Sequence, residues 1–390
     1  MAQKTVALSI NASWNIVNFR TGLIKDLQRQ GYRVVALAPV DSYSPKLQAL
    51  GVDHIPIPMD SKGVSPIRDL ILLGRYWRVL RRLRPDVFLG YTAKPNIYGS
   101  LAAHSLGIAV INNVSGLGTA FIRDDLLTRI VTGLYRLAFR RSATVFFQNE
   151  EDFDMFLAAG MVTPAQARLL PGSGVDLERF SPAAAPGEAS AFRFLLIARL
   201  LWFKGIGEYA EAARLIRRQG RDARFQLLGF LDPDNPNGVP KDQVLGWVKE
   251  GIVDYLGESD DVRPFIAEAD CVVLPSYREG MPRTLLEASA MGKPLIATDV
   301  AGCRQLVEHD LNGFLCAPRD AGSLAEAMLD MLRLSPARRE EMGQAARAKA
   351  ESQFDERIAI GLYQEAIAAA LGSGTRRSAD FSESDRARSA

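Results

Sequence analysis

The stretch LPSYREGMPRTLLE, residues 274–287, decides the fold because it contains one complete strand-to-helix turn. The apolar run Cys271–Leu274 predicts a buried strand. A polar turn follows over residues 276–280. Pro282 is expected at the first helical position, since proline has no N–H group to lose there. The helix is predicted to continue to Gly292. Strand, turn and helix in this order form the repeating unit of an α/β fold.

Two carboxylates, Glu279 and Glu287, stand on either side of this turn. Glu279 precedes the helix, and Glu287 lies roughly 7–8 Å along it at 1.5 Å per residue. The N–H groups of Gly280, Met281 and the helix start lie between them, which predicts an anion site flanked by two acceptors of hydroxyl hydrogen bonds. A sugar nucleotide has this layout, because its diphosphate lies between a hexose and a ribose. We therefore take Glu279, Glu287, Gly280 and Met281 as candidate site residues.

The length of 390 residues predicts two domains, and the composition, 47% apolar and 24% charged, is that of a soluble globular protein. No apolar run approaches the roughly 20 residues that span a bilayer. The first ten residues lack the apolar core of a signal peptide, which favours a cytoplasmic location. The three Cys and three His are not at metal-ligand spacing, so neither a zinc site nor a disulfide is expected.

The alternation of strands and helices predicts an α/β protein with two Rossmann-like domains, over residues 1–180 and 191–353. Residues 181–190, rich in Ala, Ser and Pro, are the expected linker. A helix over about 354–371 is expected to return to the first domain. The tail 372–390 is expected to be disordered, since it has few residues to bury. Ligands of such folds bind at the carboxyl ends of the strands.

The net charge of +2 is unevenly distributed. Residues 1–180 contain 21 Lys and Arg against 14 Asp and Glu, and residues 181–390 contain 26 against 31. The basic excess is concentrated in 68–84 and 123–141, which are predicted helices. Their basic faces are either simply solvated or dock on an anionic membrane leaflet. Binding to nucleic acid is not expected, because the aromatic residues form no stacking platform.

Arg199 and Lys204 follow the predicted strand Phe192–Ile197, in the loop that leads into the next helix. This loop lies at the functional edge of the fold. A guanidinium fork and an ammonium group there suit a diphosphate and would stabilise it as a leaving group. The alternative is an exposed loop with two solvated cations. The two glutamates in the same half of the chain favour the diphosphate site.

Taken together, these residues resemble the retaining glycosyltransferases of family 4, which have the GT-B fold. Glu279 and Glu287 match the family's E-x7-E motif, and Arg199 and Lys204 match its paired diphosphate cations. Three further stretches are similar to family members that extend polyprenyl-diphosphate-linked sugars, including an N-acetylgalactosaminyltransferase of bacterial protein N-glycosylation and transferases of O-antigen and capsule. They are 13–20 with Asn15, 94–99 with Lys94, and 116–118 with Gly116.

The resemblance implies transfer of a hexose or N-acetylhexosamine from a UDP-sugar to a polyprenyl-diphosphate-linked saccharide at the cytoplasmic face of the membrane. Glu279 would contact the donor sugar and Glu287 the ribose, with Arg199 and Lys204 as catalytic cations. Lys94, Asn15 and Gly116 would contribute to substrate binding. Family members of this type generally need no metal, and Asp232 and Asp234, which have metal-ligand spacing, are better interpreted as part of a turn.

One departure from the family concerns histidine. Many members carry a His after the fourth strand of the first domain, where this chain has 90–95 (GYTAKP). Lys94 is the expected polar substitute, and His104 on the following helix is expected to be structural. Two other functions stay open: a GT-B-type nucleotide-sugar epimerase or hydrolase, and a sugar-nucleotide sensor without activity. The scarcity of His argues against the first, and the presence of both cations and both glutamates against the second.

Overall fold

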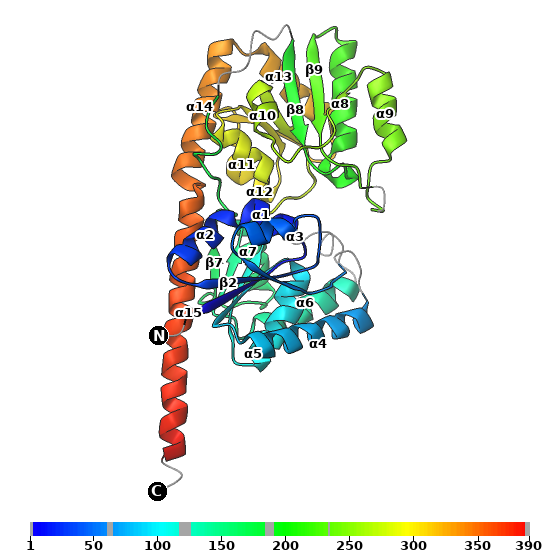
Figure 1. Ribbon diagram of the computed structural model, residues 1–390. Coiled ribbons are helices and arrows are strands. Elements are labelled where there is room, and N and C mark those ends of the chain that lie inside the picture. Colours follow the sequence, from blue (N-terminus) through cyan, green and yellow to red (C-terminus); the bar gives the residue numbers. More distant parts are fainter. Residues whose placement is uncertain (1–2, 61–64, 117–125, 184–190, 233–234, 387–390) are drawn as a thin grey trace. The chain divides into compact units, whose positions relative to one another are not determined.

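A computed structural model gives the structure of the chain and describes residues 3–60, 65–116, 126–183, 191–232 and 235–386 (Figure 1). The described chain forms two compact units. Unit 1 consists of Met1–Ser173 together with Arg357–Ala390, and unit 2 of Gly174–Glu356. Each unit is built on its own parallel sheet.

Unit 1 contains a seven-stranded sheet in the order β3-β2-β1-β4-β5-β6-β7, in which every neighbouring pair is parallel. The central strands are buried on both faces, which explains their continuous apolar runs. The strands are β1 (Thr5–Ser9), β2 (Arg33–Ala38), β3 (Asp53–Pro56), β4 (Val87–Tyr91), β5 (Ala109–Val114), β6 (Thr144–Phe147) and β7 (Ala167–Leu169).

The helices of unit 1 alternate with its strands, and between β1 and β2 two helices meet at Arg20. The Thr21 hydroxyl donates to the Val17 carbonyl at 2.6 Å, where a continuous helix would place a backbone bond. The helical elements are α1 (Ser13–Phe19), α2 (Thr21–Arg29), α3 (Ser44–Ala49), α4 (Pro66–Leu83), the π-helix η1 (Pro95–Gly99), α5 (Ser100–Ser105), α6 (Leu126–Phe139) and α7 (Glu150–Ala158).

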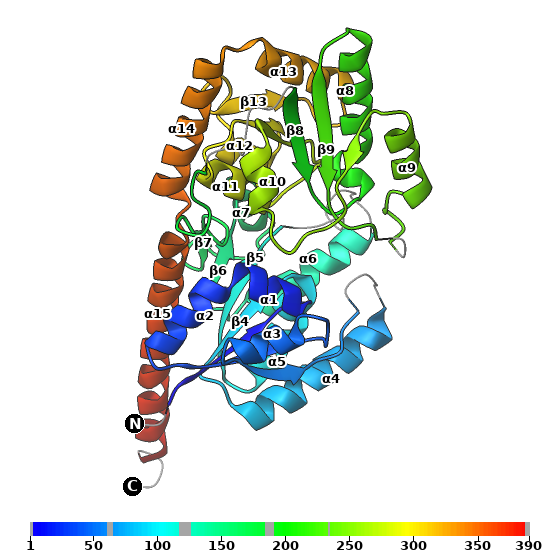
Figure 2. The same cartoon turned by 45° about the horizontal axis from the view of Figure 1, so that its top comes forward.

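Unit 2 contains a six-stranded sheet in the order β10-β9-β8-β11-β12-β13, again with parallel neighbours. Figure 2 shows this sheet with β8, β9 and β13 labelled. The strands are β8 (Phe192–Ile197), β9 (Ala223–Leu228), β10 (Asp254–Tyr255), β11 (Cys271–Leu274), β12 (Leu295–Thr298) and β13 (Gly313–Cys316). The helices are η3 (Trp202–Lys204), α8 (Ile206–Arg218), α9 (Lys241–Lys249), α10 (Arg263–Glu268), α11 (Arg283–Ala290), α12 (Ala301–Leu306), α13 (Ala321–Arg333) and α14 (Pro336–Gln353).

The chain differs from the sequence prediction at the connection between the units. Residues 174–180, expected in the first domain, lie in unit 2, because Val175 pairs with Asp355 and Phe180 is buried in the unit 2 core. The helix α15 (Glu356–Arg386) begins close to the expected residue 354, and its residues Ala359, Tyr363, Ala366 and Ile367 pack in the unit 1 core. The disorder expected for residues 372–390 stays a prediction.

The strand order reverses once in each sheet, between β1 and β4 in unit 1 and between β8 and β11 in unit 2. Connections leave these two strands in opposite directions, which opens a crevice at their carboxyl ends. Arg199, Lys204, Glu279 and Glu287 all follow β8 or β11. A ligand site is therefore expected at the reversal point of unit 2.

Candidate active site

Lys204 and Glu279 form an ion pair at the reversal point of unit 2. Lys204 ends η3 after β8, and Glu279 lies in the loop after β11. Their side chains are only 18% and 12% exposed. The low exposure strengthens the attraction relative to a surface pair. The structure thus brings together a predicted diphosphate cation and the predicted donor-sugar carboxylate.

Close backbone packing fixes the two loops that carry this pair. Gly205 has a φ of +74°, and any Cβ there would collide with the Pro275 carbonyl oxygen. A Cβ on Gly302, at the start of α12, would likewise collide with the Gly280 carbonyl oxygen. The Tyr277 N–H also donates to the Phe203 carbonyl at 2.9 Å. Glycine is therefore required at both positions, and the loops have little freedom to separate.

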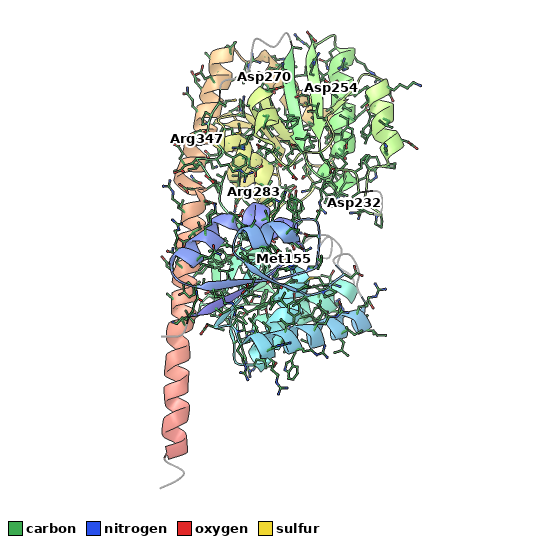
Figure 3. The ribbon with its side chains drawn as sticks, viewed as in Figure 1. Met155, Asp232, Asp254, Asp270, Arg283 and Arg347 are labelled. Atoms are coloured by element: carbon green, nitrogen blue, oxygen red, sulfur yellow. The ribbon has the colours of Figure 1, made fainter. Side chains whose placement is uncertain are left out.

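Glu287 lies one turn into α11 and forms an ion pair with Arg283, with 3.1 Å between Nη2 and Oε1. Burial raises the pKa of the Glu287 carboxyl, and the Arg283 charge partly opposes this shift. Arg283, labelled in Figure 3, also donates through Nη1 to the Gly174 carbonyl, so both terminal nitrogens of its guanidinium have partners. Arg283 was not predicted as a site residue, although its position four residues before Glu287 signals a pair on one helix face.

The loop that contains Glu279 leads directly into the first turn of α11. Pro282 is the N-cap residue and not the first helical residue, and no side chain caps the helix. Uncapped N–H groups at a helix start attract anions. Gly280 and Met281, which precede the cap, are both buried, and Met281 packs in the unit 2 core. A ligand at this site would therefore meet the backbone of Gly280 and Met281 and not their side chains.

Arg199 differs from the other predicted residues because its side chain is exposed. Among the described residues, no side-chain hydrogen bond or ion pair involves Arg199; its carbonyl accepts from Leu201 at 2.7 Å. An unpaired guanidinium three residues before η3 is available for an incoming anion. Its predicted role as a diphosphate cation stays a prediction.

The predicted residues of unit 1 lie at the carboxyl edge of its sheet, where each has a different environment. Lys94 pairs with Asp69 at 2.9 Å, and Asp69 also accepts from the Tyr98 hydroxyl at 3.0 Å. Asn15 on α1 donates to Asn11 at 3.2 Å. Gly116 is exposed with a φ of +122°, while Leu117 and Gly118 of the same motif lie outside the described residues.

The predictions for His104 and for Asp232 and Asp234 concern residues outside the two ion pairs. His104 is bonded through Nε2 to the Ala138 carbonyl at 3.0 Å, and burial lowers its pKa, as fits a structural residue. In the part of the chain that the structure describes, no three His, Cys, Asp or Glu side chains gather as a metal site would require. Asp232 accepts a hydrogen bond from Asn235, and Asp234 lies outside the described residues.

Comparison with known proteins identifies the class to which this arrangement belongs. Residues 5–149 match the family model "Glycosyl transferase 4-like", and residues 191–333 match "Glycosyl transferases group 1". Solved structures with a similar fold include Alr3699/HepE of Anabaena with UDP and glucose (TM-score 0.77, 18% identity, 94% of this chain and all of that chain). A glycosyltransferase of Rickettsia africae has a TM-score of 0.75 at 17% identity, over 95% of this chain and 99% of that one. The fold and the matched domains define a glycosyltransferase with the GT-B fold.

Curated relatives narrow the class. The N,N'-diacetylbacillosaminyl-diphospho-undecaprenol alpha-1,3-N-acetylgalactosaminyltransferase of Campylobacter jejuni is 29% identical over 81% of this chain and 86% of its own length. An Escherichia coli UDP-Gal:alpha-D-GlcNAc-diphosphoundecaprenol alpha-1,3-galactosyltransferase is 26% identical over 70% of this chain and 73% of its own. The chain belongs to the retaining glycosyltransferases of family 4.

Proposed function

We propose that the protein transfers a hexose or N-acetylhexosamine from a UDP-sugar to a polyprenyl-diphosphate-linked saccharide in the synthesis of a glycan, O-antigen or capsule. N-acetylgalactosamine is the first sugar to test, because the Campylobacter relative is named for its transfer. The observation that carries the proposal is the Lys204–Glu279 pair beside the uncapped start of α11. Cation, carboxylate and helix terminus together match the diphosphate and hydroxyl groups of a sugar nucleotide.

In the proposed reaction, Arg199 and Lys204 bind the donor diphosphate and Glu287 accepts a hydrogen bond from the ribose. Glu279 accepts from hydroxyls of the donor hexose. The acceptor hydroxyl oxygen forms a bond to the anomeric carbon on the face from which the diphosphate leaves. The bond between that carbon and the diphosphate oxygen breaks, and the hydroxyl proton passes to the departing diphosphate. The two cations then stabilise the charge that develops on UDP. We propose that this positive charge suffices without a metal ion.

The two ion pairs of the site suggest how binding begins. Lys204 can exchange its bond to Glu279 for a phosphate oxygen, which frees the Glu279 carboxylate for the sugar. Arg283 holds the Glu287 carboxylate in an ion pair, and a ribose hydroxyl would then bind to this carboxylate. Donor binding and the arrangement of the catalytic groups are thus coupled through the same side chains.

Peripheral contact with the inner membrane belongs to this proposal, and α4 supports it. With 3.6 residues per turn, one face of α4 carries Ile67, Leu70, Ile71 and Trp77, which are 75%, 69%, 50% and 40% exposed. The same face carries the exposed residues Arg78, Arg81 and Arg82. An exposed helix face with both apolar and basic side chains offers a membrane surface apolar contact and attraction to anionic headgroups. Within the described ranges, no helix has the length and apolar character needed to cross a bilayer.

The function is tested by incubating the purified protein with UDP- and GDP-sugars and a polyprenyl-diphosphate-linked saccharide. Transfer from one or more UDP-sugars is expected. A protein that transfers no sugar from any donor to any lipid-linked acceptor would refute the proposal.

Membrane contact is tested by sedimentation with anionic vesicles. Replacing Arg78, Arg81 and Arg82 by Gln should weaken binding about 100-fold, at ~1 kcal/mol per basic residue near the surface. The matched control replaces the exposed Arg217, Arg218 and Arg224 of unit 2. Equal losses for both triple variants, or no loss for the first, would contradict docking through α4.

A further inference from the structure

Arg20 is a buried cation at the reversal point of unit 1. It lies between α1 and α2, and only 6% of the residue is exposed. Its guanidinium carbon is 4.4 Å from the centre of the Tyr91 ring, and Tyr91 is the last residue of β4. Arg20 belongs to the connection that follows β1, and Tyr91 ends β4. The pair therefore lies where the strand order of the unit 1 sheet reverses. Neither residue has a role in the reaction proposed above.

The partners of Arg20 leave its charge uncompensated. Nη1 donates to the Phe19 carbonyl at 3.1 Å, and Nε is buried without a hydrogen-bond partner among the described residues. Within the same residues, no carboxylate forms an ion pair with Arg20. A buried cation normally has a carboxylate partner, because removing its hydration is costly. The ring of Tyr91 offsets only part of that cost.

The start of α2 is a second feature that attracts negative charge. This nine-residue helix has no side-chain cap, and its first turn contains no acidic residue. Phe19 is the last residue of α1, so the bond from Nη1 to its carbonyl places the guanidinium where α1 ends and α2 begins. The one carboxylate on α1 or α2, Asp26, lies near the other end of α2, where it binds Arg29 and Gln364.

The other cation near this edge differs from Arg20. Lys94, three residues after Tyr91, has its charge partner in Asp69. Arg20 combines a planar fork of N–H donors with the N–H groups and dipole of a helix start. Together these suit an oxyanion with several acceptor atoms, for which the phosphate group is the standard case.

We propose that Arg20 and the first turn of α2 bind a phosphate or diphosphate group. The identity of that group rests on the proposed function, in which it is the diphosphate of the polyprenyl-linked acceptor. Unit 2 binds the diphosphate of the donor in that reaction. Each unit then uses the reversal point of its own sheet for one of the two diphosphates.

The test measures binding of inorganic pyrophosphate to the full chain by calorimetry in the presence of saturating UDP, which occupies the donor site. Wild type is expected to bind pyrophosphate, and Arg20→Gln to bind it at least tenfold more weakly. Arg29→Gln is the matched control, because it removes the same charge from the exposed far end of the same helix. Equal affinity of wild type and Arg20→Gln, or an equal loss in Arg29→Gln, would overturn the proposal. Wild type that no longer binds pyrophosphate once UDP is present would also overturn it.

A measurement on wild type does not depend on the folding of any variant. With UDP present, pyrophosphate should slow amide hydrogen exchange of residues 21–24, and unchanged exchange there would overturn the site. In transfer assays, Arg20→Gln should raise the KM for the lipid-linked acceptor and leave the KM for the UDP-sugar unchanged. A rise in the donor KM alone would assign the site to the donor and reject the acceptor. If the protein transfers no sugar, the proposed function fails while the pyrophosphate measurements still decide the anion site.

Discussion

The reversal points of the two sheets have the same topology but differ in the burial of their unpaired cation. In unit 2, Lys204 meets Glu279, Arg283 meets Glu287, and the unpaired Arg199 is exposed. In unit 1, Lys94 meets Asp69, whereas Arg20 stacks on Tyr91 without a carboxylate among the described residues. A paired cation is stable in the free protein and must exchange partners to bind an anion. A buried unpaired cation raises the free energy of the protein without its ligand. Binding of an anion offsets this cost.

The difference indicates that one fold can hold two kinds of anion-binding cation. A cation paired with a carboxylate fits a ligand with both phosphate and hydroxyl groups, because the cation binds the phosphate and the carboxylate binds the hydroxyl. A buried cation without a carboxylate partner fits a ligand that carries negative charge alone. Substitutions in each unit test these two expectations.

The largest effect is expected for Lys204→Ala. Loss of the cation that stabilises the leaving diphosphate should lower kcat about 10²–10³-fold, as for removal of one donor to a developing negative charge. Lys249→Ala, an exposed lysine of α9, is the control. Initial rates with saturating donor measure the effect. A kcat within twofold of wild type would show that the Lys204–Glu279 pair is only structural.

Glu279→Ala should lose transfer to a similar degree while still binding UDP, because its proposed partner is the donor sugar. UDP affinity is measured by calorimetry beside the rate. A variant that loses UDP affinity and rate together would assign Glu279 to the nucleotide and not to the hexose.

Glu287→Ala should weaken UDP binding about 10- to 100-fold, as expected for a hydrogen bond to a charged group worth about 1.5–3 kcal/mol. Burial raises the pKa of this carboxyl, so protonation begins at a higher pH than for an exposed Glu. UDP affinity should therefore fall as the pH is lowered through that raised pKa. Calorimetry from about pH 7 to about pH 4 follows UDP affinity down to the ordinary Glu pKa of about 4.3. In Glu287→Gln the decline should be shallower, because only the terminal phosphate of UDP, with a pKa of about 6, then titrates. A decline identical to that of wild type would contradict the assignment.

Gly205→Ala should destabilise unit 2 by about 1–3 kcal/mol, the cost of a strained backbone position. The added Cβ also meets the Pro275 carbonyl, which would move the Lys204 loop away from Glu279. Gly246→Ala in α9 is the control, because its Cβ meets nothing, and a gain of about 0.5–1 kcal/mol is expected there. Urea unfolding followed by tryptophan fluorescence measures both. Equal effects of the two substitutions would show that the loops are not fixed by close packing.

The smallest effect is expected for Arg20→Met. If the guanidinium serves a ligand, its removal from a buried position should leave the thermal midpoint of the free protein unchanged or slightly higher, since function is often kept at a cost in stability. A fall of several degrees would show that Arg20 supports the fold and would weaken the contrast between the two units.

Much of the fold was predictable because strands buried on both faces have a strong local signal. The strands β4, β8, β11, β12 and β13 begin and end where their apolar runs do. The helix α14 was missed because its buried positions, Met342, Gly343, Ala346 and Ala350, are mostly small and give almost no apolar periodicity. Ser335 followed by Pro336 was the available signal, and Ser335 does cap the helix.

The pairing of site residues was harder to predict than their positions. Lys204 and Glu279 both follow strands at the reversal point, so their meeting follows from topology. Asp69, the partner of Lys94, lies on a different helix, α4, and no spacing rule connects the two. Whether Arg20 has a carboxylate partner depends on which acidic residues the fold brings near it. Those residues can be far from Arg20 in the sequence, so no local pattern predicts the outcome.

The helix α15 has a consequence for biosynthesis. Its residues Ala359, Tyr363, Ala366 and Ile367 complete the core of unit 1, and Asn113 donates to the Tyr363 hydroxyl at 2.8 Å. Unit 2 is one continuous segment, whereas unit 1 needs residues from both ends of the chain. On the ribosome, unit 2 can therefore finish folding first, although unit 1 is begun earlier. The N-terminal half cannot complete its core until residues 359–370 have emerged, and until then part of its apolar surface stays uncovered and prone to aggregation.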